Sequence, residues 1–183
     1  MSVERVSPPG RRQRRWWLYV LAALLGIIIT DAILVLVGAE DEGTTENSIF
    51  IDRPPGVVFD YASDMRHELE WNPDIESMAK VSDGPVGLGT QFAAKWKQSE
   101  AVTVECTRFD RPAALRLQNG GSLETTVDVS VRPQGTGSLF TSRFTARPHG
   151  LLKFIFPLFK IQMAKFEKAN MGYLKKAIEG LPR

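Results

Sequence analysis

The sequence predicts an α+β protein in which a curved antiparallel sheet, buried on one face, is covered by a long C-terminal helix and preceded by one apolar N-terminal helix. Three observations support this fold class. Several segments between residues 48 and 144 alternate apolar and polar side chains, as half-buried strands do. After Gly150, apolar residues recur instead at the three- and four-residue spacings of a helix. Residues 16–37 form an almost continuous apolar run of 22 residues.

That apolar run predicts a transmembrane helix. At 1.5 Å per residue it reaches about 33 Å, enough to cross a hydrocarbon core of about 30 Å. Four arginines lie in residues 11–15 and three acidic residues in 40–42, which places the N-terminus in the cytoplasm and the domain outside. Asp31 interrupts the span at a cost of roughly 2.5–3.5 kcal/mol near a helix centre. It is either a tolerated defect or a contact with a partner helix.

Cleavage of the N-terminal segment as a signal peptide is the alternative, because Val37-Gly38-Ala39 offers small residues for a peptidase. The apolar run, however, is longer than the usual stretch of about 7–15 residues in signal peptides. The chain is therefore divided into a basic cytoplasmic tail (1–15), a transmembrane helix (16–37), a linker (38–47) and a domain (48–183).

Charge is distributed unevenly between these parts. The first 40 residues hold five arginines and three acidic residues, which leaves 18 residues of each sign in the remainder. A neutral domain argues against nucleic acid as a partner, since nucleic-acid binding needs a basic stripe on the folded surface. The single cysteine, Cys106, excludes an intrachain disulfide.

The domain begins with an extended apolar segment, Ser48 to Ile51. Pro54-Pro55 cannot continue a sheet but can start a helix. Val57, Val58 and Tyr61 are spaced to bury one face of that helix. Asp64 is expected to cap a second short helix by accepting from free backbone N–H groups.

Trp71-Asn72-Pro73 ends the second helix, and a glycine-rich loop over residues 84–89 leads into a strand from Thr90 to Trp96. Further alternating segments follow, separated by turns at Asp110-Arg111-Pro112, Asn119-Gly120-Gly121 and 133–137. These segments place one set of side chains inward: Phe92, Ala94, Trp96, Val102, Val104, Cys106, Leu115, Leu117, Leu123, Thr125, Val127, Val129, Val131, Phe140, Ser142 and Phe144.

The C-terminal helix is predicted from Gly150 onward, with Pro157 kinking or restarting it after the first turns. It is the only element large enough to cover the sheet. Large apolar residues crowd around Pro157, and no single helix face can bury all of them: Leu151, Leu152, Phe154, Ile155, Phe156, Leu158, Phe159 and Ile161.

The order strand, two short helices, tryptophan–proline stop and glycine-rich loop resembles the START-like superfamily, also called SRPBCC or polyketide cyclase/dehydrase-like. The resemblance covers roughly residues 44–180. It implies a helix-grip fold, in which the sheet wraps the C-terminal helix and leaves an apolar cavity. The residues that carry it are Pro54, Val58-Phe59-Asp60-Tyr61, Asp64, Trp71, Pro73, Gly84-Pro85-Val86-Gly87 and Gly89-Thr90.

Motifs for catalysis or metal binding are incomplete. His67-Glu68 begins like a metalloprotease helix but lacks a second histidine one turn later, and His149 is the only other histidine. The acidic residues between Asp60 and Asp74 are interpreted as caps and solvated faces. No cofactor or metal is expected. The inward-facing residues lack the His, Glu or Asp that general acid–base chemistry requires, with Thr125 and Ser142 as polar exceptions.

We therefore expect a membrane-anchored protein that binds a hydrophobic small molecule or lipid between sheet and C-terminal helix. A polyketide cyclase or dehydratase, which would need a buried ionisable residue, and a protein-interaction module without a ligand remain alternatives; an enzyme is the less favoured one. The expected cavity-lining residues are Phe92, Trp96, Val104, Val127, Phe140, Phe144, Phe159, Met163 and Phe166.

Overall fold

The computed structural model describes residues 11–37, 42–97 and 99–182. Within its helices, some side chains lie outside this description: those of residues 11–15, 30, 31, 33–37, 154, 155, 157 and 158. The chain forms two compact units, residues 1–39 and 40–183.

The first unit contains one helix, α1 (Arg11–Val37), over the segment that the sequence predicts to be helical. In this helix the rings of Trp16 and Trp17 pack edge to face, with centroids 5.2 Å apart. No helix combines the length and apolarity needed to cross a membrane, as far as the described residues extend. The expected transmembrane helix is therefore not supported by the structure. Asp31 lies outside the described side chains, and parts of the predicted tail and linker, 1–10 and 38–41, lie outside the described residues.

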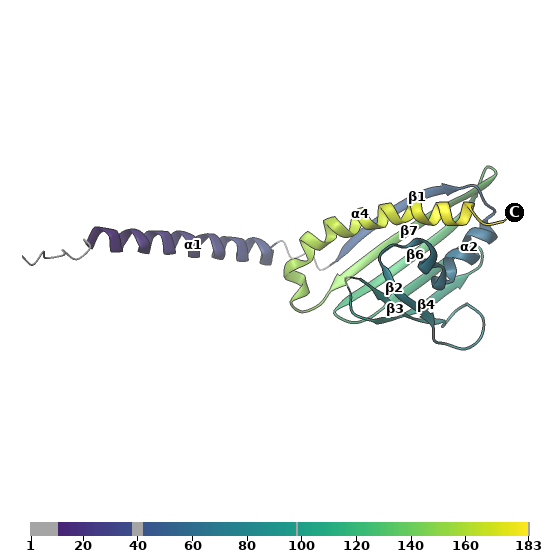
Figure 1. The fold of residues 1–183 in the computed structure, drawn as a ribbon, viewed down its shortest axis with the longest axis horizontal. Helices are drawn as coiled ribbons and strands as arrows, with labels where there is room; N and C mark the ends of the chain where they lie inside the picture. The colour runs from purple at the N-terminus through teal and green to yellow at the C-terminus, as the bar shows by residue number, and fades with distance from the viewer. Residues whose placement is uncertain (1–10, 38–41, 98, 183) are drawn as a thin grey trace, which may run out of the picture. The chain divides into compact units, whose positions relative to one another are not determined.

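The second unit is built on a seven-stranded antiparallel sheet with the order β1-β7-β6-β5-β4-β3-β2. Neighbouring strands from β2 to β7 are consecutive in the chain, and β1 joins the far edge beside β7. Figure 1 shows that this sheet is strongly curved. The strands are β1 (Gly43–Ile51), β2 (Ile75–Lys80), β3 (Gln91–Trp96), β4 (Val102–Asp110), β5 (Ala114–Asn119), β6 (Leu123–Gln134) and β7 (Gly137–Pro148).

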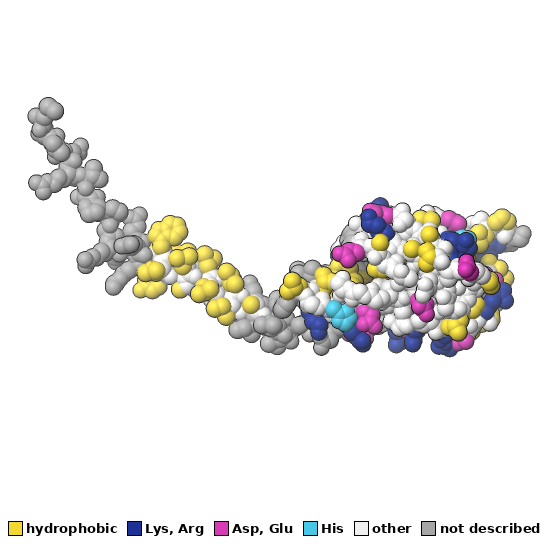
Figure 2. All heavy atoms as spheres, turned by 90° about the horizontal axis from the view of Figure 1, so that it is seen from below, with side chains coloured by type: hydrophobic (Ala, Val, Ile, Leu, Met, Phe, Trp, Pro, Cys, Tyr) yellow, Lys and Arg dark blue, Asp and Glu magenta, His cyan; other side chains and the backbone are white. Residues whose placement is uncertain are grey.

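Alternation along the strands separates an inner from an outer face. Val129 pairs with Ser142 across β6 and β7, and both side chains are buried. Their neighbours Asp128 and Arg143 point to the opposite face, because successive strand residues project to opposite sides. On that outer face, Arg143 pairs with Glu46 at 2.6 Å. Figure 2 shows basic and acidic side chains interspersed over the face of the domain in view, in keeping with its neutral charge.

Two features of the sheet differ from the sequence prediction. β2 was not predicted, because in this edge strand Met78 alone is buried and no apolar alternation results. β1 begins at Gly43, inside the predicted linker (38–47). Its first residues are polar, but pairing with the long strand β7, from Gly43 opposite Ala146 onward, makes them a strand.

Three short helices connect β1 to β2: α2 (Pro55–Ser63), η1 (Met65–His67) and α3 (Glu68–Trp71). Pro55 lies in the first turn of α2, and Asp64 caps η1 by accepting from the backbone N–H of Arg66 at 3.1 Å, as predicted. The buried face of α2 is shifted from the predicted one. Val57 is 40% exposed, whereas Phe59 is fully buried.

The C-terminal helix α4 (Leu152–Glu179) covers the inner face of the sheet and contacts β1 and β7. It continues through Pro157 without a break, and Figure 1 shows it changing direction near its start. Its far end is held by Arg53, whose guanidinium donates to the carbonyl oxygen of Glu179 at 2.7 Å. Met171 and Ile178 join the main core. The arrangement of sheet and helix is consistent with the expected helix-grip fold.

Candidate functional site

A cavity of about 870 Å³ lies between the concave face of the sheet and α4. Its walls come from α2, η1, α3, β3 to β7 and the inner face of α4. This volume falls within the roughly 300–1,000 Å³ of small-molecule sites. The sheet and helix therefore do not form a solid core.

The strand side of the cavity follows from the two-residue repeat of the sheet. Val127 lies opposite Phe144 across β6 and β7, and opposite Leu117 across β5 and β6. All three side chains line the cavity. Phe140, further along β7 on the same face, is nearly fully buried and lines it as well. Because the sheet is curved, this apolar wall stays at a distance from α4 and does not pack directly against the helix.

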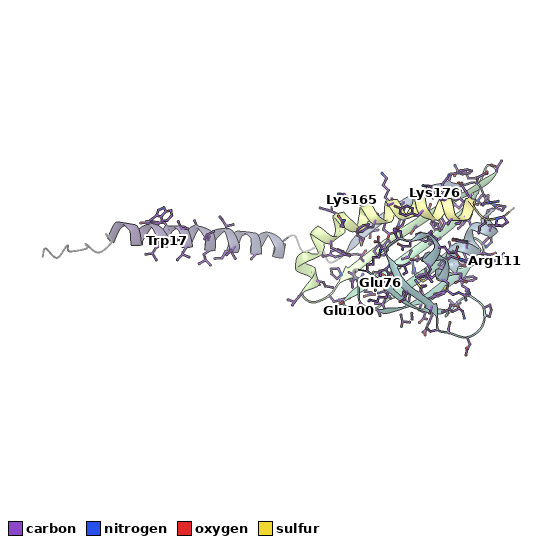
Figure 3. All side chains as sticks on the ribbon, in the orientation of Figure 1. Trp17, Glu76, Glu100, Arg111, Lys165 and Lys176 are labelled. Carbon is purple, nitrogen blue, oxygen red and sulfur yellow. The ribbon has the colours of Figure 1, made fainter. Side chains whose placement is uncertain are left out.

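The helix side of the cavity follows from the helical repeat. Phe159, Met163 and Phe166 are spaced by four and three residues and line the cavity from one face of α4. Lys165 and Lys176, on other faces of the same helix, point away from the cavity (Figure 3). At one end a small cluster of Phe156 with Ala146 and Met163 forms a second apolar core.

Eight of the nine residues expected from the sequence line the cavity: Trp96, Val104, Val127, Phe140, Phe144, Phe159, Met163 and Phe166. Phe92 does not. Its side chain is fully buried in the main core, which also contains Val58, Phe59 and Met65 from the short helices. The inward direction of Phe92 was predicted correctly, but the short helices pack over that part of the sheet and leave no cavity there. Whether the eight residues bind a ligand stays a prediction.

Two carboxyl groups in the cavity wall were missed by sequence reasoning. Glu68, on α3, and Glu167, on α4, both line the cavity. Both side chains are enclosed by neighbouring residues but remain partly exposed, because each faces the cavity. The sequence pattern groups Glu68 with the solvated acidic residues of the short helices. The sequence does contain a signal for Glu167, since it stands directly after Phe166 and four residues after Met163 on the apolar face.

Hydrogen bonds hold the Glu68 carboxylate in place. Its Oε2 accepts from Asn72 Nδ2 at 3.0 Å, and the side chain of Trp96 donates a second hydrogen bond. Burial nevertheless raises the pKa of Glu68, and these two hydrogen bonds oppose that shift. Asn72 and Trp96 also line the cavity, so the fixed carboxylate is part of its wall.

Glu167 titrates unusually close to neutral pH. Burial, followed by the negative charge of Glu68, raises the pKa of Glu167 to about 7. None of the described residues donates a hydrogen bond that would oppose this shift. At neutral pH the Glu167 carboxyl group is therefore present in both its protonated and its charged forms.

A second polar group lies where the short helices meet. The ring of His67 stacks on that of Tyr61 with centroids 4.2 Å apart, and His67 Nδ1 lies 2.9 Å from Glu70 Oε1. Tyr61 donates its hydroxyl hydrogen to Glu70 Oε2 at 2.8 Å, and burial together with that bond raises the pKa of Tyr61. These contacts satisfy the polar groups at this edge of the cavity and position η1 and α3.

Two arginines of the sheet, Arg108 and Arg143, lie outside the cavity wall. Arg108 pairs with Asp110 at 2.6 Å and Arg143 pairs with Glu46, and neither lines the cavity. In the part of the chain that the structure describes, no group of three His, Cys, Asp or Glu side chains could hold a metal ion.

Residues 42–179 match the protein family described as "Polyketide cyclase / dehydrase and lipid transport". Comparison with curated proteins finds no significant match. Solved structures share the fold at low identity. KanY matches with a TM-score of 0.62 at 19% identity, covering 77% of this chain and 100% of its own. TTHA0849 from Thermus thermophilus matches with a TM-score of 0.63 at 16% identity, covering 74% and 96%.

The di-domain ARO/CYC protein BexL, from the BE-7585A biosynthetic pathway, matches with a TM-score of 0.62 at 14% identity. The match covers 88% of this chain and 61% of BexL. Identities this low show the shared fold and nothing about activity. The family match, in contrast, spans most of the chain and agrees with the resemblance expected from Pro54, Trp71 and the glycine-rich loop. The chain therefore belongs to the polyketide cyclase/dehydrase and lipid-transport family.

Proposed function

We propose that this protein binds a hydrophobic small molecule or lipid in the cavity between sheet and α4. The observation that carries the proposal is the cavity of about 870 Å³ with its wall of valine and phenylalanine side chains. Leaving such a wall in contact with water costs roughly 25 cal/mol for each Å² of apolar surface. An apolar ligand would remove that cost, which is the driving force for binding.

Native mass spectrometry of the purified protein tests this function by detecting a retained ligand. In parallel, the neutral fluorophore Nile red should become brighter and blue-shifted when the unit Glu40–Arg183 is added. Val127→Phe should fill the cavity and reduce Nile red affinity at least roughly tenfold, because the added ring occupies ligand space. Val81→Phe is the matched control, since Val81 is 56% exposed and does not line the cavity. Equal binding by both variants would contradict the proposal.

We further propose that residues 16–37 anchor the protein in the cell membrane, with the N-terminus in the cytoplasm and the domain outside. The support is in the sequence: a 22-residue apolar run with four arginines before it and three acidic residues after it. An anchored binder would collect its ligand from the adjacent bilayer. Export after cleavage is the competing fate, and sequencing the N-terminus of the mature protein distinguishes the two.

An enzyme of the cyclase or dehydratase type is the second candidate, because Glu167 has the properties of a general acid or base. Such a group works best when its pKa lies near the operating pH. If the protein is an enzyme, wild type should convert its retained ligand to a product of altered mass, such as one that has lost water. Glu167→Gln should retain the same ligand unchanged. Identical masses from both proteins would leave binding as the function.

A further inference from the structure

Within the mainly apolar wall of the cavity, Glu68 and Glu167 form one acidic patch, here called the carboxyl pair. The two residues come from α3 and α4, which contact each other, and the charge of Glu68 acts directly on Glu167. Asn72 and Trp96 orient the Glu68 carboxylate from one side. Asn170, one turn beyond Glu167 on α4, also lines the cavity. The carboxyl pair therefore offers acceptor oxygens from two separate elements to one region of the cavity.

No lysine or arginine balances the carboxyl pair within the cavity wall that the structure describes. Five acidic residues line the cavity in total: Asp64, Glu68, Asp74, Glu100 and Glu167. Asp64 is already paired with Arg66 at 2.6 Å, so its charge is compensated outside the wall. Glu68 receives only the two neutral hydrogen bonds, and Glu167 receives none from the described residues. The described cavity wall therefore holds acidic side chains and no lysine or arginine.

This electrostatic pattern discriminates between classes of hydrophobic ligand. A fatty acid or a phosphate-bearing lipid would bring a further negative charge next to two carboxylates in a poorly solvated space, which is unfavourable. A neutral alcohol could donate one hydrogen bond but would not stabilise the charged forms of Glu68 and Glu167, which burial disfavours. A protonated amine donates hydrogen bonds and also offsets both charges. The amine is the one headgroup class of these that satisfies the carboxyl pair fully.

We propose that the cavity binds an apolar molecule bearing a protonated amine, whose N–H groups donate to Glu68 and Glu167 while its apolar body lies against Val127, Phe140 and Phe144. This inference rests on the proposed function of the cavity as a hydrophobic binding site and adds the charge class of the ligand. Ligands of this class would be long-chain or polycyclic amines. Anionic lipids would be excluded.

The test compares three probes with the same dodecyl chain and different headgroups: dodecylamine, dodecanol and dodecanoate. Each is used below its micelle concentration at pH 7.5 to displace Nile red from the unit Glu40–Arg183. This unit holds the entire core and cavity, and the solved protein KanY shows the same fold as a whole chain. We expect dodecylamine to bind at least about tenfold more tightly than dodecanoate, the equivalent of one pKa unit of differential interaction.

Glu167→Gln and Glu68→Gln should each reduce the affinity for dodecylamine about tenfold more than the affinity for dodecanol, since one offset charge is removed. Glu76→Gln is the matched control, because Glu76 pairs with Lys95 at 2.6 Å and does not line the cavity. If dodecanol or dodecanoate binds as tightly as dodecylamine, or if neither variant weakens the amine, the inference is wrong. Absence of Nile red binding to wild type would instead overturn the proposed function.

Calorimetry gives a second readout that does not depend on a variant. Near pH 7 a bound ammonium group should drive the proton off Glu167, so the heat of dodecylamine binding should change with the ionisation enthalpy of the buffer. Dodecanol should show no such dependence. The other titratable groups facing the cavity are Tyr61, Asp64, His67, Glu68, Asp74 and Glu100, and burial also raises the pKa of Glu68. Glu167→Gln must therefore reduce the proton release, and the double variant Glu68→Gln, Glu167→Gln must abolish it. Release as large as that of wild type in Glu167→Gln contradicts the role given to Glu167.

Discussion

Among single residues, Glu167 differs most from the sequence prediction, which expects no ionisable group facing the cavity. The inward-facing residues of the sheet are apolar as predicted, but the opposing helix brings a carboxyl group to the same space. Glu68, the second member of the carboxyl pair, comes from a short helix whose acidic sequence is typical of a solvent-exposed helix. Both belong to the cavity only because α3 and α4 meet across its edge.

Glu167 should make the stability of the domain depend on pH. Its pKa is about 7 in the folded state and near the ordinary 4.5 when unfolded, so the folded state binds more protons between these values. Stability should fall as pH rises from about 5 to 8, by on the order of 2–4 kcal/mol from this group. Urea unfolding at pH 5 and pH 8 measures the change.

Glu167→Gln removes one of two buried titrating groups and should weaken this pH dependence, making the variant more stable than wild type at pH 8. The remaining dependence comes from Glu68, whose pKa is also raised. Glu76→Gln, on the exposed side of β2, should retain the dependence of wild type. Parallel curves for Glu167→Gln and wild type would show that the carboxyl group is better solvated than the structure indicates.

Trp71 is expected to contribute both to the stability of the domain and to ligand binding. The sequence predicts a packed indole, for which truncation to alanine costs about 3–5 kcal/mol. In the structure Trp71 is half-buried, packs against the core and also lines the cavity. Trp71→Ala should therefore lose less, about 2–3 kcal/mol by urea unfolding, and should also weaken Nile red binding. Phe92→Leu is the contrast, since Phe92 is fully buried and away from the cavity: it should lose stability and keep binding.

At the scale of elements, the start of α4 presents apolar side chains to the surface. The crowded segment from Leu151 to Ile161 was expected to leave some of them uncovered. Among its described side chains Phe156 is buried, whereas Leu151 is 84% exposed, Ile161 62% and Phe159 39%. Exposed apolar patches of this kind mark membrane or partner contacts. The expectation is thus met for Leu151 and Ile161, and in part for Phe159, which also lines the cavity.

We predict that this start of α4 dips into the outer leaflet and admits the ligand. Leu151→Cys in a Cys106→Ala background, labelled with a polarity-sensitive fluorophore, should show a blue shift when phosphatidylcholine vesicles are added. The label leaves the lipid-free domain unaffected because Leu151 is on the surface. Val81→Cys, exposed on another part of the domain, should show no shift. Equal responses at the two positions would mean that this segment has no preference for lipid.

At the scale of the whole molecule, the two compact units have different compositions. The unit from Glu40 onward carries balanced charge, whereas the N-terminal unit combines an arginine cluster with an apolar run. The apolar side chains of the cavity wall and the apolar N-terminal run support the proposal that the protein works beside a bilayer.

The anchor predicts that the intact chain stays in the membrane fraction after a carbonate wash, because an apolar span of this length is held by the hydrocarbon core. Protease added outside cells should remove the domain and leave a small N-terminal fragment. Recovery of a soluble mature protein that begins at Glu40 would rule out the anchor and establish cleavage. A cytoplasmic protein of the same cell serves as the control for protease entry.

Local sequence patterns are sufficient to predict the fold of the domain and most of its inner face. Strand alternation and helical spacing are local patterns, so Val127, Phe140 and Phe144 could be assigned inward from their neighbours alone. β2 could not be predicted, because an edge strand with one buried side chain carries no periodic signal. The first half of β1 depends on pairing with β7, which is far away in the chain.

The packing of distant elements determines which inward-facing residues border the cavity and which charged groups line it. Phe92 and Val104 alternate in the same way, yet packing of the short helices buries the first in the core and leaves the second at the cavity. Glu68 and Glu167 stand 99 positions apart, and the effect of Glu68 on the ionisation of Glu167 depends on their distance in space. A local sequence pattern indicates which face of a strand or helix a side chain lies on. The depth of a cavity and the charged groups that line it depend on elements that come together only when the chain folds.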